Sequence, residues 1–313
     1  MSDDYLWNRS GDPDPEIEKL ETLLACYRQT GTKPAPWRPA RSRALLWLAA
    51  AASVAVAFLA ARAFLAKPPA STASAWRVTI GNDRPQPLAV GETLNTRSSG
   101  AKLEAAFVGE LRLSPESSLR VLHSSDSRQR LALQRGTLHA LIWAPPQRFV
   151  VDTPSAATVD LGCEYTLRVL PDGSGLLSVE RGWVAFQTGS VESFIPAGAA
   201  CHTRPQTGPG IPYFDDAPIA LRSALEKFDA TNGAHGLSAV LSNARPRDAL
   251  SLWHLIVRTE NGQRRQVAER FAQLVPGANV AGLEKREPAA LDAAWDALGL
   301  GETDWWRTWK RKW

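Results

Sequence analysis

The chain has 313 residues, with 36 Lys or Arg against 32 Asp or Glu, so its formal net charge is only +4. A charge this small for the length, without a dense basic patch, argues against a nucleic-acid-binding protein. After a short N-terminal head and one apolar segment, the remaining residues suffice for one large or two modest domains.

The head, residues 1–43, is predicted to hold one amphipathic helix. Asp14 is a good N-cap, Pro15 suits the first helical position, and acidic residues in the first turn favour the positive end of the helix dipole. Gly31 ends the helix, and a Pro-rich tether follows. Apolar side chains at helical spacing form one stripe, made of Ile17, Leu20, Leu23, Leu24 and Tyr27.

This stripe has nothing within the head to pack against, and a helix of about four turns is marginal alone in water. We expect a docking helix for a cytoplasmic partner. The alternatives are a helix that lies on the inner leaflet or one that packs on its own copy. The head has one Cys and no His, too few ligands for zinc.

An apolar segment at 44–66 is predicted to be a transmembrane helix. No residue from Ala44 to Ala61 is charged, and the whole segment would be roughly 34 Å long, enough for a hydrocarbon core of about 30 Å. Among its residues are Ala44, Leu45, Trp47, Phe58 and Ala66.

A permanent membrane span has two alternatives. A buried core helix of this length would normally have a polar face. A cleaved signal peptide normally begins within the first few residues, although the small residues of "PPASTASAW" resemble a cleavage site.

The charges beside the span predict its orientation. Arg38, Arg41 and Arg43 precede it, whereas Arg62 and Lys67 lie at its far end. The positive-inside rule places the N-terminus in the cytoplasm and exports about 245 residues. We therefore expect a single-pass protein with a small inner head and a large outer body.

After a linker at 67–75, residues 76–204 are predicted to be a β domain. Short runs of alternating polar and apolar residues recur every 8 to 12 residues, separated by Gly, Pro, Asp, Asn and Ser. Such runs indicate half-buried strands, and Asp172-Gly173 is a strong hairpin signal. This pattern predicts a sandwich, barrel or solenoid with little helix.

The order of motifs in this region resembles the FecR family. The carrying segments are "VGETLNTRSSGAKLEAAFVGELRLSPESSLRVL", "RLALQRGTLHALIW", "RFVVDTPSAATVDLGCEYTLRVL" and "GLLSVERGWVAF". The sharpest pieces are Thr153-Pro154 followed by Gly162, and Gly182 before Val184. We expect these residues to be structural, because Pro and Gly punctuate strands and corners.

The resemblance implies a twisted, solenoid-like β domain in the periplasm of a protein of the bacterial inner membrane. It also implies a cytoplasmic N-terminus that contacts an extracytoplasmic-function sigma factor, and an outer body that receives a signal from an envelope protein or ligand. Two departures stand out. Cys163 follows Gly162 where the family usually has Thr, and no second α/β module follows the β domain, so coupling to an outer-membrane transporter is not expected.

Two of the three cysteines, Cys163 and Cys201, fall in the exported body. An oxidising compartment would permit them to form a disulfide. Two buried free thiols are the alternative, because sequence does not place the two residues within bonding distance.

A Pro/Gly-rich linker at 205–217 precedes a helical C-terminal domain at 218–313. Four or five short helices with brief turns predict a small bundle or a helical-repeat fragment, either a binding surface or a cap on the β domain. In the tail at 303–313, Trp305, Trp309 and Trp313 share one helix face among basic residues. Such a helix suits a membrane interface or a groove on a partner, or packs into the bundle.

Nothing in the sequence indicates catalysis. The five His are scattered, and the motifs HExxH, CxxC and GxSxG do not occur. We expect no enzyme activity, no cofactor and no metal. The predicted fold class is a mainly β exported domain, a FecR-like twisted solenoid or sandwich, with one transmembrane helix and an α-helical C-terminal domain.

Two functions remain open. The first is a membrane-spanning regulator of a sigma factor. The second is a non-signalling structural or assembly protein of the cell envelope, which uses the β domain as a binding module and the head only as an anchor.

Overall fold

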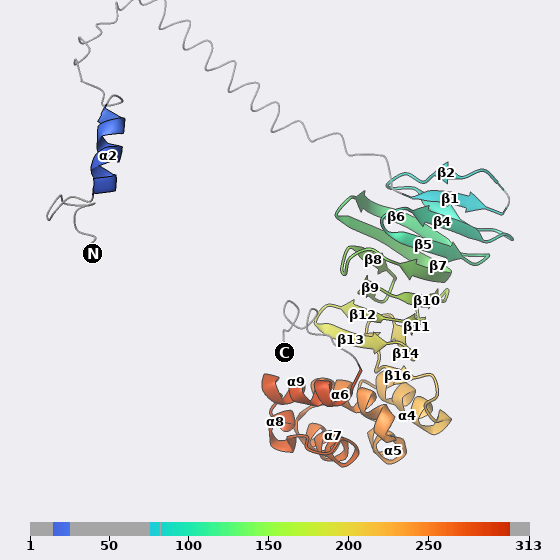
Figure 1. Cartoon of the computed structure of the whole chain (residues 1–313). Helices are drawn as coiled ribbons and strands as arrows, with labels where there is room; N and C mark the ends of the chain where they lie inside the picture. Colours follow the sequence, from blue (N-terminus) through green and yellow to red (C-terminus); the bar gives the residue numbers. More distant parts are fainter. Residues whose placement is uncertain (1–14, 26–75, 82, 301–313) are drawn as a thin grey trace, which may run out of the picture. The chain divides into compact units, whose positions relative to one another are not determined.

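A computed structural model describes residues 15–25, 76–81 and 83–300 (Figure 1). The chain divides into two compact units, residues 1–67 and 68–313. The predicted span at 44–66, the predicted stripe residue Tyr27 and the tail at 303–313 lie outside the described residues. No helix in the described ranges is long and apolar enough to cross a membrane.

In the first unit, the head helix forms as α2 (Pro15–Leu24). Pro15 occupies its first position, and Glu16 and Glu18 lie in its first turn, where negative charge favours the helix dipole. No residue of α2 is buried. Its apolar stripe is therefore presented to the surroundings.

The second unit begins with two β-sheets that share one long strand. The first sheet has this order: β2 (Gln86–Pro87), β1 (Arg77–Ile80), β4 (Ala101–Ala105), β5 (Gly109–Leu113), β7 (Arg128–Ile142), β10 (Glu164–Val169), β11 (Gly175–Arg181) and β14 (Ala199–Arg204), with β15 (Gly208–Pro209) and β16 (Tyr213–Phe214) both paired to β14. The second has this order: β3 (Thr93–Asn95), β6 (Ser118–Ser125), β7, β8 (Phe149–Asp152), β9 (Ala157–Asp160), β12 (Trp183–Thr188) and β13 (Val191–Pro196). All pairs are antiparallel except β7 with β8, which is parallel.

Strand β7 passes from one sheet to the other at Gly136. Residues 128–135 pair with β6, whereas residues 136–141 pair with β10 and residues 138–142 pair with β5. Gly136 has a φ of +97°, and a Cβ there would overlap the side chain of Ser117. Only glycine fits this crossing point, because other residues avoid positive φ and here would also collide.

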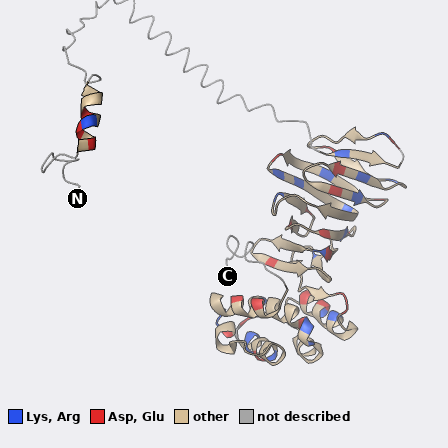
Figure 2. Ribbon diagram, viewed as in Figure 1, with Lys and Arg blue, Asp and Glu red and all other residues tan. Residues whose placement is uncertain are grey.

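The strands bury alternate side chains, as the period-two pattern predicts. In β4, Leu103 lies in the core while Lys102 and Glu104 face outward. On this outer face Lys102 forms ion pairs with Glu104 (2.6 Å) and with Glu110 of β5 (3.0 Å). Basic and acidic residues are interspersed with uncharged ones along the strands of the β region (Figure 2). Exposed pairs of this kind add little stability, so the buried face supplies the hydrophobic driving force.

The helices lie at the end of the strand stack, beyond β13, β14 and β16 (Figure 1). They are α4 (Ile219–Ala230), α5 (Leu237–Asn243), α6 (Ala249–Arg258), α7 (Asn261–Leu274), α8 (Val280–Glu284) and α9 (Pro288–Ala297). Residues 249–256 of α6 are all buried, so α6 is the central helix of the group.

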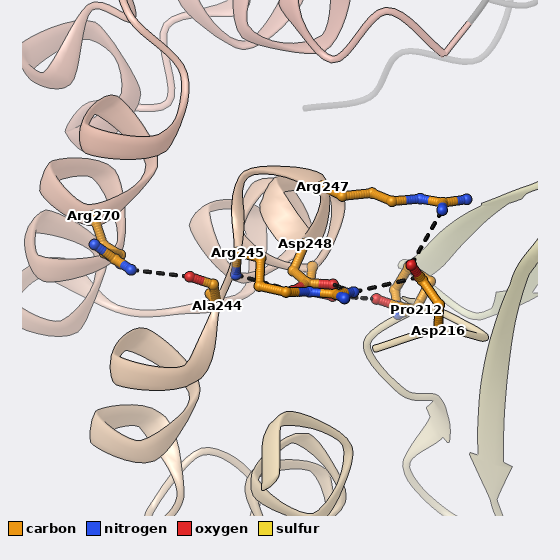
Figure 3. A network of polar contacts seen from close by, with 8 residues as sticks. Pro212, Asp216, Ala244, Arg245, Arg247, Asp248 and Arg270 are labelled. Carbon is orange, nitrogen blue, oxygen red and sulfur yellow. Dashed lines mark hydrogen bonds and ion pairs between the residues drawn. The ribbon is translucent and has the colours of Figure 1, made fainter. Parts of the chain in front are cut away.

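The range predicted as a linker, 205–217, belongs partly to the sheet. β15 and β16 fall within it and pair with β14. Polar contacts tie residues on both sides of β16 to the helical region (Figure 3): Asp216 accepts from Arg245 (3.3 Å) and Arg247 (3.2 Å), and the Ser251 hydroxyl donates to the Pro212 carbonyl (2.6 Å). Strands and helices are thus joined without a free tether between them.

Candidate functional site

The predicted partner-binding residues of the head lie on α2 with their apolar side chains largely exposed. Leu20, Leu23 and Leu24 are 56%, 69% and 60% exposed, and Ile17 is half-buried. Acidic side chains of the same helix flank them. A short helix with this apolar face has the form that hydrophobic grooves on partner proteins recognise.

In the second unit, α6 covers the outer edge of β13. The Phe194 backbone N–H donates to Nε2 of His254 (3.0 Å), and one Arg258 nitrogen donates to the Glu192 carbonyl (3.1 Å). His254 and Arg258 are one helical turn apart, so they meet successive outward-facing groups of the strand. This covering satisfies an edge that would otherwise be open to pairing with another chain.

The hydrogen bonds of His254 define its tautomer. Nδ1–H donates to the Leu250 carbonyl (2.9 Å), which leaves Nε2 as the acceptor for Phe194. Burial lowers the pKa of His254 to about 3, with the charge of Arg258 acting in the same direction. The imidazole is therefore neutral at physiological pH.

Aromatic rings fasten the helices to the second sheet. The Trp295 ring of α9 lies 4.7 Å from Trp253 of α6, 5.9 Å from Trp183 of β12 and 6.1 Å from Phe194 of β13, measured between centroids. The Trp253 indole N–H donates to the Leu291 carbonyl (3.0 Å). Tilted aromatic contacts of this kind combine large apolar burial with a preferred geometry.

A groove of about 980 Å³ opens between the β13–β15 region and helices α4, α6 and α7. Its wall carries both charge signs, from Asp229 of α4, Arg258 of α6, and Arg204, Glu260 and Arg286. A groove of this size with convergent polar groups has the form of a small-molecule or peptide site.

Two charged side chains are held in place on the wall of this groove. Oδ2 of Asp229 accepts the Ile211 N–H (3.0 Å), and it occupies the space that a side chain at Gly210 would fill. Arg258 donates to the Pro209 carbonyl (2.7 Å). Burial raises the pKa of Asp229 and lowers that of Arg258, while their mutual attraction opposes both shifts.

The described residues contain no cluster of His, Cys, Asp and Glu that could hold a metal ion. Cys201 and Cys163 are poor nucleophiles, because burial raises the pKa of Cys201 to about 12 and that of Cys163 well above its usual value. The wall of the groove presents charged and hydrogen-bonding groups.

The disulfide between Cys163 and Cys201 does not form; both are free, buried thiols. Cys201 pairs with Leu177 in β11, whereas Cys163 lies against Gly182 just past the end of that strand. The separation of about five residues corresponds to roughly 16 Å along a strand, and a disulfide needs Cα atoms within about 7 Å.

Cys163, at the position where the FecR-like pattern has Thr, belongs to a buried polar corner. Asp160 accepts the Gly162 N–H (2.7 Å) and the Cys163 thiol. Burial raises the pKa of Asp160 to about 7, and the nearby Tyr165 hydroxyl has no hydrogen-bond partner among the described residues. The corner thus buries a carboxyl and a thiol together.

The remaining motif residues make turns. The Thr153 hydroxyl donates to the Ala156 carbonyl (2.8 Å) and shapes the turn between β8 and β9, with Pro154 beside it. Gly162 and Gly182 have φ values of +91° and +74°. Side by side, they let two corners of the sheets approach closely.

Sequence reasoning missed the groove and the covered edge of β13. The signal that could have found the covered edge is the pair His254 and Arg258, two polar residues spaced four apart on a mostly apolar helix. The groove had no such signal, because its wall is assembled from segments far apart in the chain.

Together the described residues form a β-rich unit with a helical cap, and an amphipathic helix in the head. No family model and no characterised protein matches the chain. Two crystal structures of a "putative anti-sigma factor" from Parabacteroides distasonis ATCC 8503, at 1.65 Å and 2.50 Å resolution, are similar to it, each with a TM-score of 0.35 and 14% identity.

The match covers 42% of this chain and 63% of the other, so it spans less than two thirds of the neighbour's length. A likeness at this TM-score carries no argument about fold or function.

Proposed function

We propose that this protein is a single-pass regulator of FecR type in the bacterial inner membrane. In this proposal the head is cytoplasmic and α2 binds an extracytoplasmic-function sigma factor. The β unit and its helical cap lie in the periplasm and bind a signal from the cell envelope. The protein acts by binding and has no catalytic step.

The exposed leucine face of α2 is the observation that carries the proposal. Leu20, Leu23 and Leu24 are each more than half exposed on a helix of ten residues. A helix this short is marginal in isolation, and burial of its apolar face in a partner would stabilise it. The acidic residues beside the leucines favour a partner surface with basic side chains around its groove.

The membrane part of the proposal is supported by the sequence from 44 to 66 and its flanking charges. In the outer body, the groove beside Asp229 and Arg258 is the proposed site for the envelope ligand. Its mixed charges suit a peptide or another ligand that carries both charge signs.

The test uses the full chain, extracted in detergent, and each sigma factor of the organism in turn. Replacing Leu20 and Leu24 together with Asp should abolish co-purification of one sigma factor and derepress its target genes. Thr22→Asp is the control, because it places one Asp on α2 about 200° around the helix from both Leu20 and Leu24. It should leave binding intact.

Failure of every sigma factor to bind the unaltered chain would remove the sigma-factor proposal and leave the fold unaffected. The second candidate function is then favoured, a non-signalling envelope protein that uses the groove as its binding site. Under that function the double Asp variant behaves like the unaltered protein.

A further inference from the structure

A second groove, of about 490 Å³, lies where β16, the start of α6, the end of α7 and the end of α9 meet. The side chains that line it are apolar apart from that of Arg247, and they include Phe214, Leu250, Val275, Pro276, Leu298 and Leu300. Polar atoms also make up part of the wall. Arg247 is the charged residue on this wall, and its guanidinium lies 4.3 Å above the centroid of the Phe214 ring. An apolar groove is a place for another apolar segment to bind.

The described part of the chain ends inside this groove. α9 ends at Ala297, and Gly299 adopts the left-handed conformation, with a φ of +65°, that commonly ends a helix and redirects the chain. Leu298 and Leu300, on either side of it, both line the groove. The sequence that follows therefore starts at the groove itself.

That sequence is "GETDWWRTWKRKW", residues 301–313, and its composition complements the groove. Trp305 and Trp309 are spaced one helical turn apart, so both indoles can face the same apolar wall. Asp304 precedes them and can add to the negative charge that Asp216 already presents to Arg247. Trp305 is five residues from Leu300, at most about 17 Å when extended.

We propose that residues 301–313 fold back and fill this groove, with Trp305 and Trp309 against the apolar wall and the basic residues in solvent. The tail is then an intramolecular part of the helical cap, which it completes. This inference is independent of the sigma-factor proposal, because it concerns the other end of the chain.

The test measures access to the groove in the full chain. Ala297 is exposed and lines the groove, so Ala297→Cys, placed in a Cys26→Ser background, reports on its occupancy by the rate of alkylation with N-ethylmaleimide. The full chain should react about tenfold more slowly than a chain that ends at Leu300, the ratio for a docked population of about 90%.

Replacing Trp305 and Trp309 together with Ser should restore the faster rate in the full chain. Ala289→Cys is the matched control, at an exposed site in the first turn of α9 that does not line the groove. Its rate should be the same with and without the tail. The Cys26→Ser protein without an added cysteine provides the background from Cys163 and Cys201.

Equal rates at Ala297→Cys in the full and shortened chains would overturn the proposal. Protection that appears only after adding vesicles of phosphatidylethanolamine and phosphatidylglycerol would also overturn it, because the tail would then bind membrane. Protection that grows with protein concentration would overturn it in favour of the tail of a second copy.

Discussion

The buried imidazole of His254 predicts a specific loss of stability in mild acid. Its two nitrogens bridge the Leu250 carbonyl of α6 and the Phe194 N–H of β13, and only the neutral ring satisfies both. Protonation would place a second hydrogen opposite the Phe194 donor and a charge inside the aromatic cluster. The perturbation is His254→Gln, which removes the titrating group.

The magnitude follows from the pKa. Burial lowers the pKa of His254 from 6.5 to about 3, so between these values the unfolded chain binds a proton that the folded protein does not. Stability therefore falls as the pH drops below 6.5. At pH 5, which is 1.5 units below the unfolded value, the cost is about 2 kcal/mol, at about 1.36 kcal/mol per unit.

Asp160 acts with the opposite sign. Because burial raises its pKa to about 7 from 3.8, the folded protein holds this proton more tightly, and stability contributed by Asp160 rises as the pH falls through that window. The pH dependence of the unaltered protein thus combines both effects. The difference between the unaltered protein and His254→Gln isolates the histidine, since Asp160 is present in both.

The assay is urea unfolding of the full chain in detergent at pH 7.5 and pH 5.0, followed by tryptophan fluorescence. The unaltered protein should lose about 2 kcal/mol more than His254→Gln between the two pH values. Ser251→Ala is the control: it removes the hydrogen bond to Pro212 without a titrating group, and should shift both measurements equally. Equal pH dependence in the unaltered protein and His254→Gln would refute a buried neutral imidazole.

Three further predictions follow from other parts of the second unit. Gly182→Ala should cost at least about 2 kcal/mol of folding free energy, since φ is +74° and the added methyl group would overlap the Gly162 carbonyl. The control Gly189→Ala, at positive φ in open space, should cost about 1 kcal/mol. Equal losses in the two variants would contradict the close approach of Gly182 to Gly162. Trp295→Ala should cost about 3–5 kcal/mol by chemical denaturation, and a loss below about 1 kcal/mol would mean the ring does not join helices to strands. Cys163 and Cys201 should resist alkylation in the native protein and react fully in urea, whereas rapid native labelling would contradict their burial.

The larger part of the fold could be predicted from sequence, because local patterns specify it. The alternation in "KLEAAFVGELRL" became β4 and β5, and the helical periodicity around Trp253 became α6. β15 and β16 escaped prediction, since strands of two residues in Pro- and Gly-rich sequence have no periodicity to detect. α5 and α8 are likewise too short, at seven and five residues, to show a stripe.

The same distinction, between features with a local sequence pattern and features without one, applies to the candidate functional surfaces. The leucine stripe of α2 is local and could be read from spacing within ten residues. The groove beside Asp229 and Arg258 joins positions from Ser190 to Leu291, so no local pattern reports it. The sequence could not predict whether Cys163 and Cys201 form a disulfide, because a count of cysteines does not give the distance between them. The strand register keeps the two residues too far apart to bond.

Residues 128–135 of β7 belong to one sheet and residues 136–142 to the other, so the length of this strand fixes the pairing register of both sheets. An inserted residue within this strand would shift one half by a single step and turn its inward side chains outward. Evolution and protein engineering are therefore free to lengthen an exposed hairpin turn such as Asp126-Ser127, between β6 and β7, but must keep the length of β7 fixed.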